Sequence, residues 1–209
     1  MKRKLDVNAW ERKAHFDFFS LFDEPFFGVT VRIDCTKAQH LAQEKGQSFF
    51  LYYLYRALQA CQDVEPFRYR IEAGEVFVYD EVHASPTISR PNGTFGFSYM
   101  TYFPDETRFI EEAQQEIDRI QQSTDLIPAV SGENVIHFSA IPWLDFTSIS
   151  HARSFSFPDS SPKISFGKIT EDGHLKSMPV SIHVHHGLMD AFHIGLWVDS
   201  FQEKLNADK

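Results

Sequence analysis

The sequence predicts an α+β protein with one large, mostly antiparallel or mixed sheet and helices packed against it. Short alternating apolar segments separated by turn residues recur along the chain, which is typical of strands in hairpins. Between them lie longer segments whose apolar residues repeat at helical spacing. The length of 209 residues suits one large domain, so we expect a single domain over residues 1–209.

The first half of the chain mixes both kinds of segment. Asp6 or Asn8 can cap a helix that runs through about Leu21, and Pro25 ends it. The helix expected over 49–60 should be deeply buried because its apolar residues are almost continuous. The elements that follow Pro25 are expected as a strand over 27–33, a short helix over 36–46 and this apolar helix over 49–60.

The second half is richer in predicted strands. Turn residues at 72–75 and 90–93 separate short alternating segments, which predicts two hairpins. A polar segment over 105–123 carries one apolar stripe and predicts a surface helix. The remaining elements are expected as strands over 134–141, 163–169 and 176–186 and a final helix over 191–206.

Composition excludes several classes of protein. The formal net charge of −9 argues against broad nucleic-acid binding, which needs lysine and arginine to neutralise phosphates. Cys35 and Cys61 form no CxxC pair, so we expect no zinc site and no disulfide framework. No secretory signal and no membrane-spanning segment is visible. We therefore expect a cytoplasmic protein with no metal, nucleic-acid or membrane partner.

Four of the ten histidines fall between Pro179 and His193. The alternating residues before His186 predict a strand that ends at a glycine, and a sheet holds a histidine in that place rigidly enough to act as a general base. Taken by itself, His186 is equally consistent with a core histidine whose ring nitrogens bond to the backbone. Asp190 by itself is consistent with a simple helix cap.

The segment HHGLMD at 185–190 resembles the HHxxxDG motif of the chloramphenicol acetyltransferase family, within the wider coenzyme A-dependent acyltransferases. Other segments resemble this family in order along almost the whole chain. The resemblance implies an αβ-sandwich fold and an acyltransferase, more narrowly an acetyltransferase, activity. Its co-substrate would be acetyl-coenzyme A, and the acetyl group would pass directly to a hydroxyl of a small molecule such as chloramphenicol. It implies no metal.

The resemblance also implies the roles of four catalytic residues. His186 would be the general base, and Asp190 would form a salt bridge with Arg12 that orders the site. Ser139, in a segment ending Ser-Ala-Ile-Pro-Trp, would donate a hydrogen bond to the oxyanion of the tetrahedral intermediate. Without the resemblance, Ser139 is an ordinary polar residue of a strand.

Coenzyme A binding would involve the segment around Ser165. Ser165 takes the place of a family threonine near the cofactor, and Ser139 lies close to it by the same resemblance. Lys168 could support the phosphates, although a solvated lysine at a strand end is the simpler interpretation.

By the resemblance, five residues are expected to line the acceptor pocket: Phe18, Phe19, Phe27, His151 and Lys163. Phe19 replaces a family tyrosine, which removes a hydroxyl from the pocket. His151 and Lys163 replace aliphatic residues, and they would suit a more polar or anionic acceptor than chloramphenicol.

Ala191 replaces the glycine that ends the motif. If that position needs a positive φ, the Cβ has a cost; in the first turn of a helix, alanine is harmless.

The resemblance further implies a homotrimer with active sites between subunits, and antibiotic resistance as one physiological role. Other readings stay open: the same chemistry on another acceptor, a coenzyme A-binding scaffold without activity, or the core of a dihydrolipoyl acyltransferase. A metal site built from the His183 and His185 pair together with His193 is disfavoured, because the spacing does not place a third ligand convincingly beside the pair.

Overall fold

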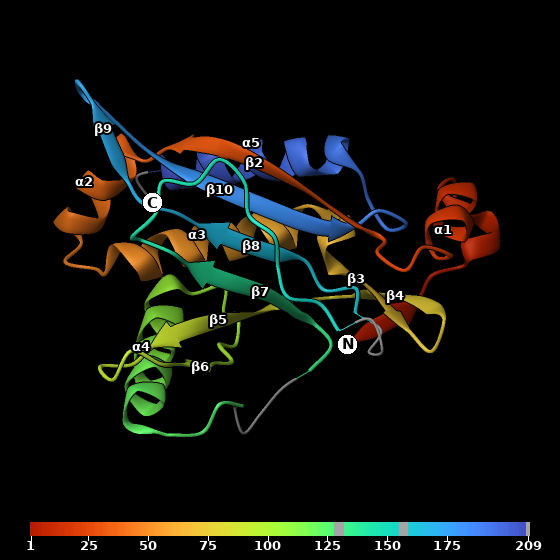
Figure 1. Ribbon diagram of the computed structural model, residues 1–209, viewed down its shortest axis with the longest axis horizontal. Coiled ribbons are helices and arrows are strands. Elements are labelled where there is room, and N and C mark those ends of the chain that lie inside the picture. Colours follow the sequence, from red (N-terminus) through yellow and green to blue (C-terminus); the bar gives the residue numbers. More distant parts are fainter. Residues whose placement is uncertain (128–131, 155–158, 208–209) are drawn as a thin grey trace.

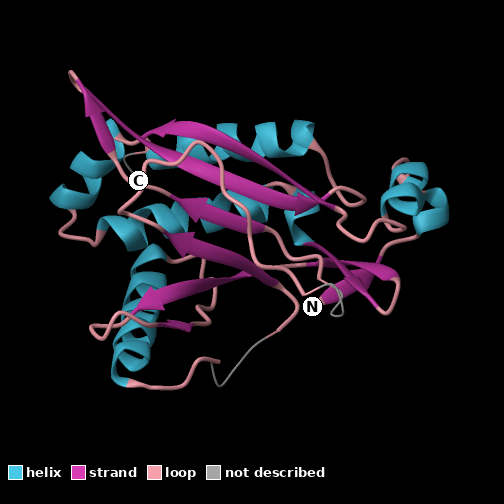
Figure 2. Ribbon diagram, in the orientation of Figure 1, coloured by secondary structure: helices cyan, strands magenta, loops and turns pink. Residues whose placement is uncertain are grey.

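The computed structural model describes residues 1–127, 132–154 and 159–207. Two sheets of unequal size carry the chain, and helices cover one face of the larger sheet (Figures 1 and 2). The strands are β1 (Lys2–Lys4), β2 (Phe26–Asp34), β3 (Tyr69–Glu72), β4 (Glu75–Tyr79), β5 (His83–Ser89), β6 (Phe95–Phe97), β7 (Val135–Ala140), β8 (Lys163–Phe166), β9 (Thr170–Asp172) and β10 (Leu175–His185). The helices are α1 (Lys13–Phe19), α2 (Thr36–Glu44), α3 (Phe49–Asp63), α4 (Glu106–Gln122) and α5 (Ala191–Leu205), with short 3-10 helices at Val7–Ala9 and Glu65–Arg68.

The large sheet has the strand order β2-β10-β8-β7-β5-β6, and β9 pairs with β10. Its centre is parallel, because β7 pairs in parallel with both β5 and β8. Its long edge is antiparallel, with β10 pairing between β2 and β8. The predicted α+β fold with a mixed sheet is therefore confirmed.

One face of this sheet packs against the helices. Alternate side chains such as Val29 and Ile33 of β2 and Ile182 of β10 point toward this core. Helices α3 and α5 contact each other across it, and both lie behind the strands in Figure 2. The apolar helix expected near the centre is α3, and its residues are mostly buried, as predicted.

The other face carries polar residues and is crossed by the connection between β7 and β8 (Figure 1). Arg32 of β2 forms an ion pair of 2.8 Å with Asp145 in this connection. The backbone N–H of Lys168 donates to the carbonyl of Leu144 at 2.8 Å. The connection is thereby tied to the sheet at both its edge strand and its middle.

One expectation about the N-terminal region was wrong, and one strand there was not expected. The single helix through Leu21 is two pieces, since Asp6 caps only the 3-10 helix and α1 starts at Lys13. No element was expected over Lys2–Lys4, which forms β1 and pairs with β4 at the edge of the small sheet. Its lysines reach acidic partners, Lys2 to Glu72 and Lys4 to Glu75, so charge pairing compensates for the missing apolar pattern.

Across the described residues, no helix combines the length and apolar character that crossing a bilayer requires. The cytoplasmic location stays a prediction.

Candidate active site

His186 lies directly after the last residue of β10, where the chain turns toward α5. Its backbone N–H donates to the carbonyl of Pro25 at 2.8 Å, which anchors the turn to the start of β2. The ring nitrogen Nδ1 is 3.3 Å from the carbonyl oxygen of Met189. Because a carbonyl oxygen only accepts hydrogen bonds, this contact places the proton on Nδ1 and leaves the lone pair on Nε2.

Two phenylalanines hold the half-buried ring of His186. Phe19 stacks on it with a centroid distance of 3.9 Å and an interplanar angle of 19°. Phe27 lies on its other side at 4.4 Å. Phe18 points away and is 58% exposed, so of these three predicted pocket residues only Phe19 and Phe27 touch the histidine within this chain.

Arg12 connects both ends of the turn that carries His186. Its Nη1 donates to Oδ2 of Asp190 at 2.5 Å, and its Nη2 donates to the backbone carbonyl of His186 at 3.0 Å. Partial burial alone would raise the pKa of Asp190, but the Arg12 guanidinium keeps that pKa below its ordinary value. The pairing expected between Arg12 and Asp190 is thus present in the structure.

Asp190 is also the helix cap considered from sequence. Its Oδ1 accepts the backbone N–H of Phe192 at 3.0 Å, and its own N–H donates to Nδ1 of His193 at 3.2 Å. The two carboxylate oxygens therefore serve different partners, one the helix and one Arg12. Ala191 is the first residue of α5 and has no positive φ, so the missing motif glycine has no backbone cost here.

Ser139 belongs to a line of four hydroxyl residues across the polar face, which we call the hydroxyl row. Strand register pairs Ser139 of β7 with Ser165 of β8, Ser165 with Ser181 of β10, and Ser181 with Thr30 of β2. Ser165 is completely buried, and its Oγ finds no hydrogen-bond partner among the described residues. Lys168, two residues past the end of β8, is exposed at the rim of the same face.

The structure does not bring Ser139 and His186 together within one chain. Ser181 lies in the row of Ser139, and His186 is five residues further along β10. Five extended residues span about 17 Å. A base and an oxyanion donor at that distance cannot contact the same acyl group.

The next residues on the same face form a second line, the imidazole–lysine row. His137 of β7 pairs with Lys163 of β8, Lys163 with His183 of β10, and His183 with Gly28 of β2. His151 reaches this row from the β7–β8 connection and packs edge-on against His183 at 4.7 Å. The structure thereby brings His151 and Lys163 to one place, as expected, and adds His137 and His183.

Charged groups near this row are paired. Lys163 forms an ion pair with Asp159, and Arg153 forms one of 3.2 Å with Glu24. Burial, reinforced by neighbouring positive charge, lowers the pKa of His151 and of His137 to about 4. These imidazoles are therefore neutral at physiological pH.

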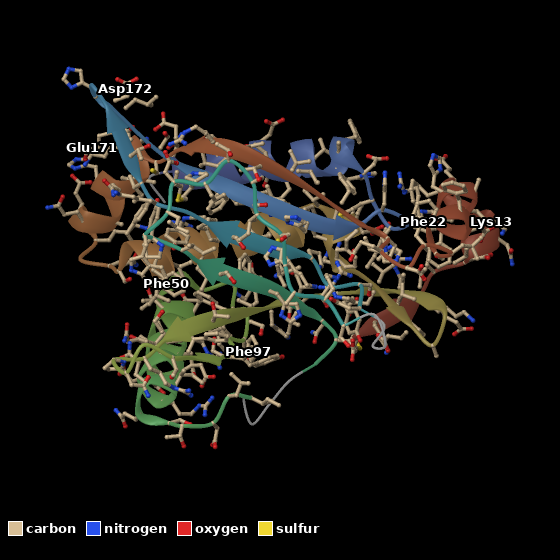
Figure 3. The ribbon with its side chains drawn as sticks, in the orientation of Figure 1. Lys13, Phe22, Phe50, Phe97, Glu171 and Asp172 are labelled. Atoms are coloured by element: carbon tan, nitrogen blue, oxygen red, sulfur yellow. The ribbon has the colours of Figure 1, made fainter. Side chains whose placement is uncertain are left out.

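A cavity of about 490 Å³ opens beside Asp159, the ion-pair partner of Lys163 in this row. Its lining includes Phe22, Arg153, Asp159 and His185. Phe22 follows α1 at the end of the molecule opposite Asp172 (Figure 3). In residues 1–127, 132–154 and 159–207, no three histidine, cysteine or acidic side chains converge as metal ligands would.

His137 and His183 were not predicted as site residues. His183 was weighed only as a metal ligand, and His137 was passed over as part of a strand. The alternation of β7 places His137 on the face of Ser139, which is a signal that the sequence contains. Its neighbours in the row depend on the register between distant strands, which local sequence does not encode.

His185 makes stability depend on pH. Burial lowers the pKa of His185 to about 4, whereas an unfolded histidine titrates near 6.5. Between these values only the unfolded chain takes up the proton, so the free energy of unfolding is fully present above about pH 6.5 and falls toward pH 4. The loss from this residue is on the order of 3 kcal/mol.

Urea unfolding at a series of pH values tests this prediction in His185→Gln. The Gln side chain can still accept the N–H of Gly187, which His185 Nδ1 accepts at 3.2 Å. We expect a shallower loss of stability below about pH 6.5 in the variant, because only the parent retains the depressed titration. Equal slopes would contradict the assignment.

Arg12→Ala is expected to lower any activity that depends on His186, mainly by loosening the turn around it. It removes two charge-assisted hydrogen bonds, each typically worth about 1.5–3 kcal/mol, so the melting temperature should fall as well. The measurements are kcat and thermal unfolding, with Arg12→Lys as a variant that keeps the charge. Activity and stability equal to the parent would remove Arg12 from the site.

Comparison with known proteins gives a consistent picture. The family model for chloramphenicol acetyltransferase matches residues 2–202. Chloramphenicol acetyltransferase 3 of Escherichia coli is 28% identical over 207 residues, covering 98% of this chain and 97% of the relative. A chloramphenicol acetyltransferase of Proteus mirabilis is 28% identical over 95% of this chain and 92% of its own length.

Solved structures agree with the sequences. A chloramphenicol acetyltransferase superposes with a TM-score of 0.90 at 33% identity, covering 98% of this chain and all of the other. The dihydrolipoamide acetyltransferase of Azotobacter vinelandii, at 12% identity and a TM-score of 0.66 over 93% of this chain and 86% of its own, shares the fold alone. The chain belongs to the chloramphenicol acetyltransferase family of acetyl-coenzyme A-dependent enzymes.

Proposed function

We propose that residues 1–209 form one catalytic domain that transfers the acetyl group of acetyl-coenzyme A to a hydroxyl of a small acceptor. The observation that carries the proposal is the contact of His186 Nδ1 with the Met189 carbonyl at 3.3 Å, which in a neutral ring leaves the lone pair on Nε2. Membership of the family supports the reaction class.

In this mechanism, Nε2 of His186 takes the proton of the acceptor hydroxyl as the oxygen attacks the thioester carbon. The hydroxyl of Ser139 donates a hydrogen bond to the oxyanion that forms. When the carbon–sulfur bond breaks, the protonated His186 returns the proton to the departing thiolate. Arg12 and Asp190 hold the His186 backbone in place throughout and exchange no proton.

We propose that the active site lies between subunits of a homotrimer. Within one chain His186 lies about 17 Å beyond Ser181 along the chain, and Ser139 is two strands to the side of Ser181, so a second copy would present its His186 to this hydroxyl row. Ser165 and Lys168 lie on the Ser139 side and would contact coenzyme A there. The family resemblance supports the trimer.

Chloramphenicol is one candidate acceptor, because the relatives are named for it. Phe18, Phe19 and Phe27 would provide apolar surface near His186. A more polar acceptor is the second candidate, favoured by the observation that His151 and Lys163 converge on one row.

A thiol-release assay with acetyl-coenzyme A and chloramphenicol tests the proposal, with coenzyme A binding measured by calorimetry. Thiol release that depends on the acceptor would support acetyl transfer to chloramphenicol. Coenzyme A binding without release on chloramphenicol would direct the search to polar acceptors. Binding without turnover of any acceptor would favour a scaffold, and absence of coenzyme A binding would contradict the proposed function.

Mixed oligomers test the shared site. Trimers assembled from His186→Ala chains and Ser139→Ala chains contain some interfaces with an intact His186 facing an intact Ser139. We therefore expect the mixture to recover part of the parent activity although each variant alone is nearly inactive. The matched control is a mixture of His186→Ala chains with chains carrying both substitutions, which should stay inactive. No recovery in verified mixed trimers would place both residues in one chain.

A further inference from the structure

The imidazole–lysine row lies one pleat from Ser139 on the same strands. His137 and Lys163 are each two residues before a member of the hydroxyl row, Ser139 and Ser165 respectively. Two extended residues advance the strand by about 7 Å. A small molecule whose reacting hydroxyl lies near Ser139 can therefore reach this row with its far end.

The row offers a positive charge that is not sealed off. The ammonium of Lys163 binds the carboxylate of Asp159 and lies 3.2 Å from the carbonyl of Ser161, which leaves one of its three N–H groups for another partner. The Lys163 side chain is 12% exposed. The 490 Å³ cavity is lined by Asp159, the ion-pair partner of Lys163, and by Arg153, so a ligand can approach Lys163 from this side.

Neutral imidazoles surround this ammonium. Burial and the charges of Lys163 and Arg153 together keep the pKa values of His151 and His183 low. Burial is the largest cause of these shifts, and the charges of Lys163 and Arg153 add a positive potential in which a negative ligand is stabilised. Neutral imidazoles can still donate hydrogen bonds to it.

Two buried polar atoms on this face await partners, one beside the imidazole–lysine row and one in the hydroxyl row. Nε2 of His151 and Oγ of Ser165 form no hydrogen bond with the described residues. A buried polar group without a partner is costly, and a bound ligand is one way to satisfy it. A ligand with oxygen atoms at its far end would find donors and acceptors here.

Gly28 makes room for the row at its outer edge. A Cβ at Gly28 would stand 2.2 Å from Nε2 of His183, so any other residue would displace that ring. The His183 ring therefore lies across β2, where His151 packs against it. The arrangement depends on matched residues from β2, β10 and the β7–β8 connection.

We propose that the imidazole–lysine row binds a carboxylate of the acceptor, so that the substrate class is a small hydroxylated carboxylic acid. Lys163 with His137, His151 and His183 would determine specificity, and the hydroxyl of the acid would react at Ser139. A monoanion fits better than a phosphate, because Lys163 and Arg153 already have carboxylate partners and the buried guanidinium of Arg70 is held by backbone carbonyls. This inference rests on the proposed acetyl transfer.

The test compares 4-(hydroxymethyl)benzoate with 4-(hydroxymethyl)benzamide, which differ in charge and share a skeleton. Binding to the intact protein with coenzyme A present is measured by calorimetry, and kcat/KM is measured by thiol release. We expect the acid to be preferred over the amide by roughly tenfold or more in both measurements, as typical charge-assisted hydrogen bonds would give.

The decisive variant is Lys163→Met/Asp159→Asn, which removes both charges and leaves neither one unpaired in the interior. The acid preference should fall to roughly twofold or less while binding of the amide is retained. Lys204→Met/Asp63→Asn removes an ion pair of 2.7 Å on α5 and α3 and is the matched control, expected to keep the preference. Melting temperatures of both variants show that they fold.

The outcomes separate this inference from the proposed function. An acid that binds no better than the amide, or fails to bind, overturns the carboxylate site, even where chloramphenicol is acetylated. A preference that survives in Lys163→Met/Asp159→Asn also overturns it. Acid-selective binding that depends on Lys163, without thiol release on any acceptor, supports the carboxylate site and contradicts acetyl transfer.

Discussion

His186→Ala is expected to lower kcat for acetyl transfer by about a thousandfold, within the usual range for loss of a general base. The effect should be on kcat, because the ring that accepts the proton is lost while coenzyme A binding depends on other residues. His186 is prepared for this role by two separate restraints, the contact of Nδ1 with the Met189 carbonyl and the stacking on Phe19.

The measurement is kcat in the thiol-release assay with the acceptor that the parent enzyme uses. His174→Ala is the matched control, since His174 is an exposed histidine in the turn before β10 and should leave kcat unchanged. Calorimetry should give a similar affinity for coenzyme A in all three proteins. A His186→Ala enzyme with kcat within about tenfold of the parent would exclude general-base catalysis by this residue.

Ser139→Ala is expected to lower kcat by about a hundredfold to a thousandfold, the usual cost of losing an oxyanion donor. The Ser139 hydroxyl is half-buried on the polar face of β7, so its hydrogen bond would form in a partly desolvated place. The Michaelis constants should change little, because this hydrogen bond strengthens only as negative charge develops on the oxygen.

Ser181→Ala is the control from the same hydroxyl row. Ser181 is buried on β10, and its Oγ lies 3.3 Å from Nδ1 of His183 rather than next to Ser139. We expect this variant to keep most of the parent kcat. Equal losses in both variants would mean that the row matters for packing, and no loss in Ser139→Ala would remove it from the mechanism.

Much of the fold was predictable because its elements carry local signals. Strand β2 and helix α5 follow from alternation and capping, and both lie within a residue or two of the expected ranges. Strand β1 could not be predicted, because Lys2-Arg3-Lys4 has no apolar residue and is ordered by its partners on β3 and β4. The pairing of β1 with β4, which is distant in the sequence, determines this strand, and the local residue pattern does not.

The site was predictable to a similar degree. The pairing of Arg12 with Asp190 was expected and is present, although 178 positions separate the two residues. The row that joins His137, Lys163 and His183 was not expected, because it depends on the parallel register of β7 with β8 and the antiparallel register of β8 with β10. A resemblance carries over individual residues, whereas a row of side chains exists only in the folded sheet.

The one-pleat offset between the two rows has a consequence for evolution. If the proposed site is right, a change at His137 or Lys163 would alter the contacts to the far end of the acceptor and leave the serines two residues further along in place. Substitutions at a few such positions can therefore change the acceptor from one small molecule to another. The serines of the hydroxyl row would keep the reaction, and the residues of the imidazole–lysine row would set which acceptor is bound.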